Sequence, residues 1–134
     1  MRELVCVGAG GCLGAIARYY VSGWVKSWLF NKYGPEFPFF ALGTMVVNVA
    51  GCMLIGVLPG LIQRHLLSET TPLVLMTGFL GALTTFSTFG SETVEMFLGE
   101  GDARYAILNV AGNLALGIGG VLMGRYLAAA VTGG

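Results

Sequence analysis

The residues most suited to chemistry lie in the third apolar stretch of the chain, residues 73–98. Between Met76 and Phe89 this stretch carries two glycines and five hydroxyl side chains, an unusual load for a segment so apolar. A helix of this composition is expected to break near residues 81–85. Backbone freed at membrane depth must be buried against protein or line a cavity, where its carbonyls can hold a hard cation. The alternative is a glycine kink that serves packing only.

Two phenylalanines of the same stretch, Phe86 and Phe89, are three residues apart and so share one face of a helix. The edge of an aromatic ring carries partial positive charge, so ring edges can line an anion path without a formal charge. Simple lipid or core contact is the alternative. Their placement favours the anion path, because four hydroxyl residues surround them: Thr84, Thr85, Ser87 and Thr88.

Polar side chains also recur at helical spacing in the second and fourth apolar stretches. Thr44 and Asn48 are four residues apart, and the fourth stretch repeats this spacing with Tyr105, Asn109 and Asn113. Asparagine inside a membrane commonly holds helices together by hydrogen bonds. Asparagines on two helices, together with the hydroxyls, also predict a continuous lining rich in hydrogen-bond donors.

Charged residues are nearly absent from the middle of the apolar stretches. Weak binding suits conduction, because an ion held by a strong charge does not leave. Arg18 is the one cation well inside a stretch rather than at its end, and it either extends to the membrane surface or draws anions into a vestibule. Glu92, near the end of the third stretch, is a candidate for the mouth of the same path.

Helices in a lipid bilayer are the elements expected to position these residues. The 134 residues are 55% hydrophobic and 10% charged, against about 25% charged in ordinary soluble domains. Four stretches are long enough to cross a membrane, and no strand alternation appears. We therefore predict an all-α integral membrane protein, with residues 1–134 as one domain and short loops, including one with His65, between the spans 4–28, 37–62, 73–98 and 104–126.

Positive charges at the two ends of these spans nearly balance, with three on one side and three or four on the other. The positive-inside rule then gives almost no preferred orientation. Insertion in both orientations would allow an antiparallel homodimer. A zero formal net charge gives no indication of a nucleic-acid partner.

Three motifs together resemble the Fluc family of fluoride channels, also called CrcB proteins: residues 10–15 with Arg18 and Tyr19, GTMVVNVAG at 43–51, and GFLGALTTFSTFGSET at 78–93. The resemblance implies a multi-pass protein of the bacterial inner membrane that is a channel rather than an enzyme. It also implies passive fluoride export and a dual-topology antiparallel homodimer with two pores.

The same resemblance implies roles for individual residues. A structural sodium ion would lie at the dimer centre, held by main-chain oxygens of Gly81 and Thr84. Phe86 and Phe89 would line the pores, with Asn48 as a donor to fluoride. The polar track would comprise Thr44, Thr88, Tyr105, Asn109 and Asn113, where relatives often carry serine in place of the last two.

Two other functions fit the residues. One is a proton-coupled exporter similar to the small multidrug-resistance proteins, which needs a carboxylate at membrane depth. The first span holds only Glu3, at its start, while Glu92 and Glu95 lie near the end of the third. The other is a structural membrane protein whose polar residues only hold helices together.

Overall fold

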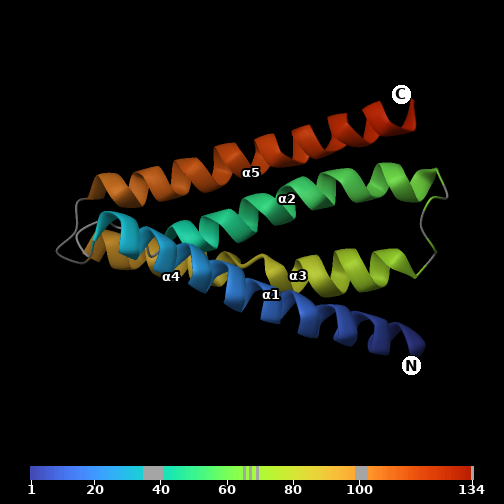
Figure 1. The fold of residues 1–134 in the computed structure, drawn as a ribbon, viewed down its shortest axis with the longest axis horizontal. Coiled ribbons are helices and arrows are strands. Elements are labelled where there is room, and N and C mark those ends of the chain that lie inside the picture. The colour runs from blue at the N-terminus through green and yellow to red at the C-terminus, as the bar shows by residue number, and fades with distance from the viewer. Residues whose placement is uncertain (35–40, 65, 67, 69, 99–102, 134) are drawn as a thin grey trace.

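A computed structural model describes residues 1–34, 41–64, 66, 68, 70–98 and 103–133, and the elements in these ranges are all helical. They run roughly along one long axis, and the two ends of the chain lie at the same end of the bundle (Figure 1). In chain order they are α1 (Arg2–Tyr33), α2 (Leu42–Gln63), the π-helical segment η2 (Pro72–Leu80), α3 (Gly81–Leu83), α4 (Phe86–Leu98) and α5 (Ala103–Thr132).

Four stretches of helix in the described residues are long and apolar enough to cross a membrane: Arg2–Tyr33, Leu42–Gln63, Pro72–Leu98 and Ala103–Thr132. The expected all-α membrane protein with four long apolar helices is confirmed at this level. The first and last helices extend beyond the predicted spans. Some of the predicted features lie outside the described residues. These are the start of the second predicted span at residue 37, His65, and parts of the predicted loops before residue 37 and after residue 98.

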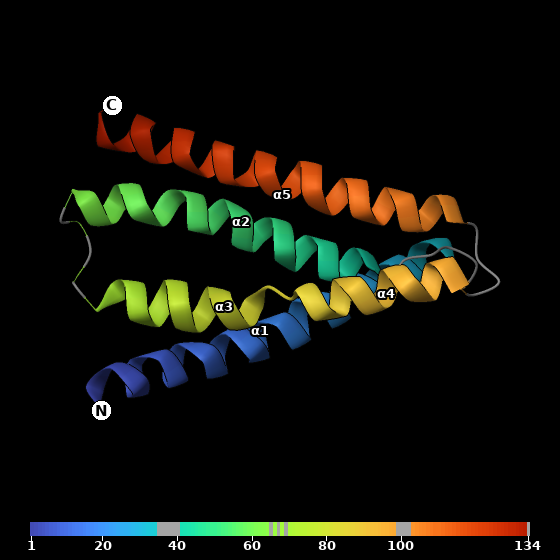
Figure 2. The same cartoon turned by 180° about the vertical axis from the view of Figure 1, so that it is seen from behind.

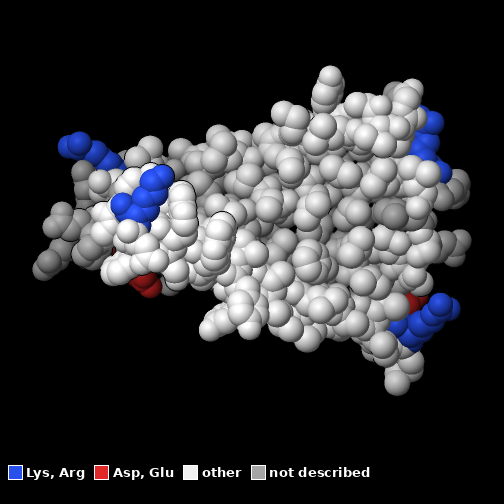
Figure 3. All heavy atoms as spheres, viewed as in Figure 1, with Lys and Arg blue, Asp and Glu red and all other residues white. Residues whose placement is uncertain are grey.

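Charge is distributed as a bilayer-embedded protein requires. On the face that Figure 3 shows, lysine, arginine and acidic side chains gather at the two ends of the bundle, and the middle is free of them. The middle exposes large apolar side chains instead, among them Leu13, Ile16, Leu114 and Ile118. Burying these side chains among lipid acyl chains is favourable. The lipid therefore covers apolar surface that a protein core would bury in a soluble protein.

Glycines let the helices pack backbone to backbone. A Cβ atom added at Gly10 or Gly14 of α1 would overlap the carbonyl oxygen of Val74 or Phe79 on η2. The contact between α2 and α5 is equally close, because a Cβ at Gly124 would overlap the carbonyl oxygen of Met53. Such small-residue contacts are how helices associate in lipid, where apolar burial gives no preference for protein over acyl chains.

A short non-helical segment separates the two halves of the third span. Helix α3 ends at Leu83, and Thr84 has extended backbone with φ −82° and ψ 151° before α4 begins at Phe86. Figure 2 shows the chain passing between the labels α3 and α4 without a helical turn. Beside this segment Leu80 and Leu83 form the main core cluster with Val47 and Leu58 of α2, so the segment is held against α2.

The close contact of α1 with η2 gives a first prediction. Gly14→Ala should lower the free energy of unfolding by about 1–3 kcal/mol, the usual cost of overpacking, because the new methyl group meets the Phe79 carbonyl. The measurement is the thermal unfolding midpoint in detergent. Gly23→Ala on the same helix is the matched control, since a Cβ there meets nothing within 4 Å, and alanine favours helix. Equal midpoints for the two variants would contradict the close approach.

Candidate functional site

The side chain of Asn48, on α2, bonds the backbone of Thr85 at both polar atoms. Its Oδ1 accepts a hydrogen bond from the Thr85 N–H at 2.8 Å, and its Nδ2 donates to the Thr85 carbonyl at 3.3 Å. An asparagine amide has one acceptor and two donors, so it can pair with both backbone groups at once. These bonds stand in for helical bonds of the backbone at the interruption between α3 and α4.

Thr85 also caps the start of α4. Its hydroxyl oxygen accepts a hydrogen bond from the Thr88 N–H at 3.3 Å and lies 3.0 Å from the Thr88 hydroxyl and 3.3 Å from that of Ser87. A threonine hydroxyl that accepts from the third residue of the following helix is a standard N-terminal cap. The cap lets α4 begin at Phe86, two residues after the extended Thr84.

The same two interactions change the surroundings of the carbonyls predicted to hold a cation. In a continuous helix the Gly81 carbonyl would bond the N–H of Thr85, and the Thr84 carbonyl that of Thr88. Here Thr85 N–H is directed to Asn48 and Thr88 N–H to the Thr85 hydroxyl. The interruption thus deprives two carbonyls of their usual helical partners within a membrane span.

A chain of side-chain hydrogen bonds runs from Asn48 along α5. Asn48 Nδ2 donates to Asn113 Oδ1 at 3.2 Å, and Asn113 Nδ2 donates to Asn109 Oδ1 at 3.0 Å. The buried Asn109 then donates to the hydroxyl of Thr93, on α4, at 2.9 Å. The three predicted asparagines therefore lie together, but they are bonded to one another. A ligand would have to displace one of these bonds or take up a donor that is left over.

Six of the predicted residues line one groove of about 410 Å³ between α2, α5 and the third span: Asn48, Gly81, Thr84, Phe86, Phe89 and Asn113. The rings of Phe86 and Phe89 lie with centroids 5.5 Å apart and planes tilted by 50°. Among the described residues, none that lines this groove is charged. The Phe86 side chain is 82% exposed in the single chain, so the groove has an open side.

A second cavity, of about 400 Å³, lies on the other side of the interruption, between α1, α2 and α4. Its lining includes the predicted residues Arg18, Thr44 and Thr88. Thr85 lines both this cavity and the groove that holds Phe86. Nine of the predicted site residues thus divide between two hollows that meet at the capping threonine.

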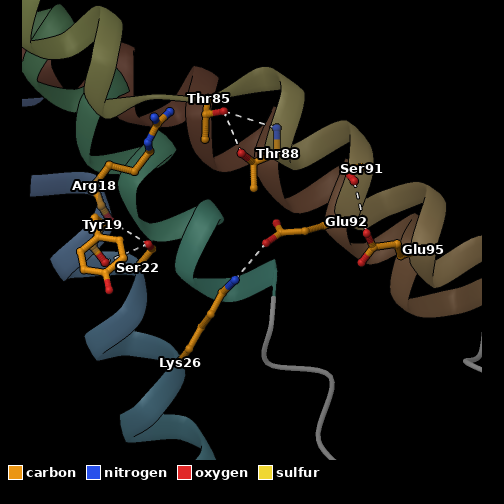
Figure 4. Close-up of polar contacts among 9 residues, drawn as sticks. All are labelled: Arg18, Tyr19, Ser22, Lys26, Thr85, Thr88, Ser91, Glu92 and Glu95. Carbon is orange, nitrogen blue, oxygen red and sulfur yellow. Dashed lines mark hydrogen bonds and ion pairs between the residues drawn. The ribbon is translucent and has the colours of Figure 1, made fainter. Parts of the chain in front are cut away.

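Three predicted residues lie apart from both linings: Tyr105, Glu92 and Asn109, whose hydrogen bonds are described above. Tyr105 is near the start of α5, one helical turn before Asn109, and is 43% exposed. Glu92 is buried, and its Oε1 lies 3.2 Å from the Nζ of Lys26 on α1. Figure 4 shows this pair bridging the two helices.

Three residues have roles at the site that the sequence analysis did not predict: Thr85, Thr93 and Lys26. The cap at Thr85 had a local indication, since a threonine three residues before another polar residue is typical of a helix start. For Lys26 the only indication in the sequence was weak, namely that it is a second cation two helical turns after Arg18. Thr93 had none, because its role depends on which helix faces it.

Comparison with known proteins places the chain among relatives. Residues 5–125 match the family described as "CrcB-like protein, Camphor Resistance (CrcB)". The chain belongs to this CrcB-like family. It is 42% identical over 127 residues to a protein of Shewanella sp. (strain W3-18-1) and to one of Shewanella baltica (strain OS185), each named "Fluoride-specific ion channel FluC". Each alignment covers 95% of this chain and 96% of the relative.

Family and fold agree on the setting of this CrcB-like chain. With four apolar helices and bacterial relatives over nearly its whole length, it is a multi-pass protein of the bacterial inner membrane. Both hollows of the site lie between those helices. The site therefore lies within the part of the chain that is apolar and long enough to cross the bilayer.

The double bond of Asn48 to the Thr85 backbone gives the second prediction. Asn48→Ala should lower the free energy of unfolding by about 1–3 kcal/mol, because it leaves a buried N–H and a carbonyl without partners. Asn113→Ala is the matched control, since the Asn113 side chain bonds only Asn48 and Asn109 within the described part of the chain. Thermal midpoints in detergent measure both. An equal or larger loss for Asn113→Ala would contradict the assigned role of Asn48.

Proposed function

We propose that the chain is a fluoride-selective channel through which cytoplasmic fluoride leaves passively, so that the cell resists fluoride. The observation that carries the proposal is the meeting of two hollows at Thr85. One is lined by cations and hydroxyls, and the other by amides and aromatic rings without formal charge. Relatives of the same length that are 42% identical are named fluoride-specific ion channels, which supports the same assignment.

The chemistry of the groove suits a small anion. Fluoride holds its water tightly, so a pathway must offer donors in place of that water. The ring edges of Phe86 and Phe89 would offer partial positive charge, and fluoride would take the amide N–H groups of Asn48 in exchange for their present bonds to Thr85 and Asn113. Because no fixed charge lines the groove, an anion is not trapped there, and release stays fast.

Passive flow is sufficient for export. In acidic surroundings fluoride enters cells as neutral HF, which ionises in the less acidic cytoplasm and cannot return across lipid as the anion. An open path for the anion then lets fluoride leave down its gradient. This role needs no energy source and no catalytic group in the protein.

The working unit we propose is an antiparallel homodimer with two pores. The groove is open on the side where Phe86 is exposed, and a second copy would close it. The nearly even distribution of arginine and lysine between the two ends allows both orientations in the bilayer. An inverted second copy gives the symmetry that many transporters achieve with inverted repeats in one chain.

We further propose that a sodium ion joins the two copies at the interruption of the third span. The carbonyls of Gly81 and Thr84 have lost their helical N–H partners, and a hard cation prefers oxygen ligands. Both residues line the open groove, where the second copy would bring its own pair of oxygens. The ion would take the place of the N–H partners that these carbonyls have lost.

Fluoride efflux tests the channel, and it gives the third prediction. Liposomes that contain the purified protein and fluoride should release fluoride rapidly when a potassium ionophore removes the charge imbalance. Phe86→Ile and Phe89→Ile should suppress release strongly, because the ring edges are lost while the apolar volume remains. Phe97→Ile, on the exposed part of the same helix, is the matched control and should conduct normally.

Three outcomes would overturn parts of this assignment. Release that requires a proton gradient would favour the exporter similar to the small multidrug-resistance proteins. No release from folded dimer would favour a structural protein. Normal release by both Phe86→Ile and Phe89→Ile would remove the ring edges from the pathway while leaving the channel in place.

Removal of sodium gives the fourth prediction. At constant ionic strength, replacing Na⁺ by N-methylglucamine should lower the thermal midpoint of the dimer, and the midpoint should rise with the logarithm of the Na⁺ concentration, as for any ligand that binds only the folded state. The measurement is a thermal scan in detergent across a sodium series. Potassium that stabilises equally would exclude sodium selectivity, and a midpoint indifferent to every cation would exclude the cation site.

A further inference from the structure

The cavity on the α1 side of the interruption carries two cationic side chains. Arg18 and Lys26 both come from α1, two helical turns apart, and both line it. The remaining polar lining consists of hydroxyls, from Ser22, Tyr19, Thr44, Thr85 and Thr88. The Ser22 hydroxyl donates to the Arg18 carbonyl at 2.6 Å, and the Thr85 and Thr88 hydroxyls lie 3.0 Å apart and bond each other. The lining therefore offers positive charge together with the hydroxyls of Tyr19 and Thr44, a combination that suits a small anion.

Lys26 is held in place by a buried carboxylate. Its Nζ lies 3.2 Å from Glu92 Oε1, and the Glu92 side chain is only 8% exposed, against 39% for that of Lys26. Glu92 is the one partner of Lys26 in the described part of the chain, so two of the three ammonium N–H groups remain for other acceptors. The ion pair fixes a long flexible side chain beside the cavity.

The other carboxylate oxygen has no such partner. Glu92 Oε2 is buried and accepts no hydrogen bond among the described residues. In Figure 4 it points away from Lys26. A buried carboxylate that depends on one ammonium repels nearby anions when that ammonium is removed. Lys26 therefore compensates Glu92 and adds positive charge to the cavity at the same time.

We propose that Lys26, positioned by Glu92, sets the charge of this cavity together with Arg18, and so the concentration of fluoride that enters the pathway. The proposal rests on the channel function proposed above. Two positive side chains and one negative one leave a single net positive charge. That charge concentrates anions next to Thr85, where the uncharged groove begins, and it is small enough to let them move on.

A charge series at this ion pair tests the proposal. Lys26→Met leaves no net charge, Glu92→Gln leaves two positive charges, and the double variant restores one. The half-saturating fluoride concentration for efflux should therefore be lowest in Glu92→Gln, similar in wild type and the double variant, and highest in Lys26→Met. Each step should be about fivefold or less, the factor that unit charges 4 Å apart give in water.

Controls separate charge from structure. Lys26→Arg keeps the charge and should match wild type. Lys32→Met removes a lysine of the same helix whose ammonium lies over the Trp28 ring, 4.9 Å from its centroid, and should also match wild type. All differences should shrink at high ionic strength, because salt screens a wet cavity over about 8 Å at 0.15 M and less at higher concentration.

The possible results are distinct. The predicted order of half-saturating fluoride concentrations, measured per folded dimer, supports the proposed role of Lys26 in setting the charge of the cavity. If wild type conducts but the single variants change only the yield of folded protein, or the double variant is as impaired as Lys26→Met, the pair is structural and the proposal is wrong. If wild type releases no fluoride, the channel function itself fails, whatever the variants do.

Discussion

The site depends on one interaction, the pairing of the Asn48 carboxamide with the backbone of Thr85. The hydrocarbon of a bilayer contains no water that could satisfy an open backbone, so an interrupted helix there must find partners within the protein. Asn48 supplies an acceptor and a donor to the same residue. This pairing allows Thr84 to be extended, and it leaves the Thr85 hydroxyl available to start α4.

The same carboxamide joins this interruption to the fourth span. Besides its two bonds to Thr85, it donates to Asn113, and further bonds lead from Asn113 through Asn109 to Thr93. Helices α2, α5 and α4 are thus connected by uncharged groups. In lipid such bonds matter because apolar burial does not distinguish a neighbouring helix from acyl chains. Backbone contact at glycines such as Gly14 and Gly124 supplies the rest of the helix association. Holding helices together and presenting donors are thus two uses of one set of amides.

Charge is placed according to how well each location tolerates it. The groove beside Phe86 has none, which suits an anion that must leave again. The cavity beside Arg18 has positive charge, and Lys26, which lines it, is paired with the buried Glu92. An anion passing from the cavity to the groove would exchange attraction to charge for attraction to dipoles at Thr85, which borders both.

The sequence by itself determined the four spans and the polar stripes on them. Hydropathy and helical spacing are local properties, so the positions of Asn48, Asn109 and Asn113 on their helices followed directly from residue order. It also predicted irregular backbone near residues 81–85, since glycines and hydroxyls weaken a helix locally. The tertiary structure alone decided the partners. Asn48 meets Thr85 across 37 residues and Lys26 meets Glu92 across 66, because each pair depends on the rotation and depth of two packed helices, which residue spacing within either helix does not encode.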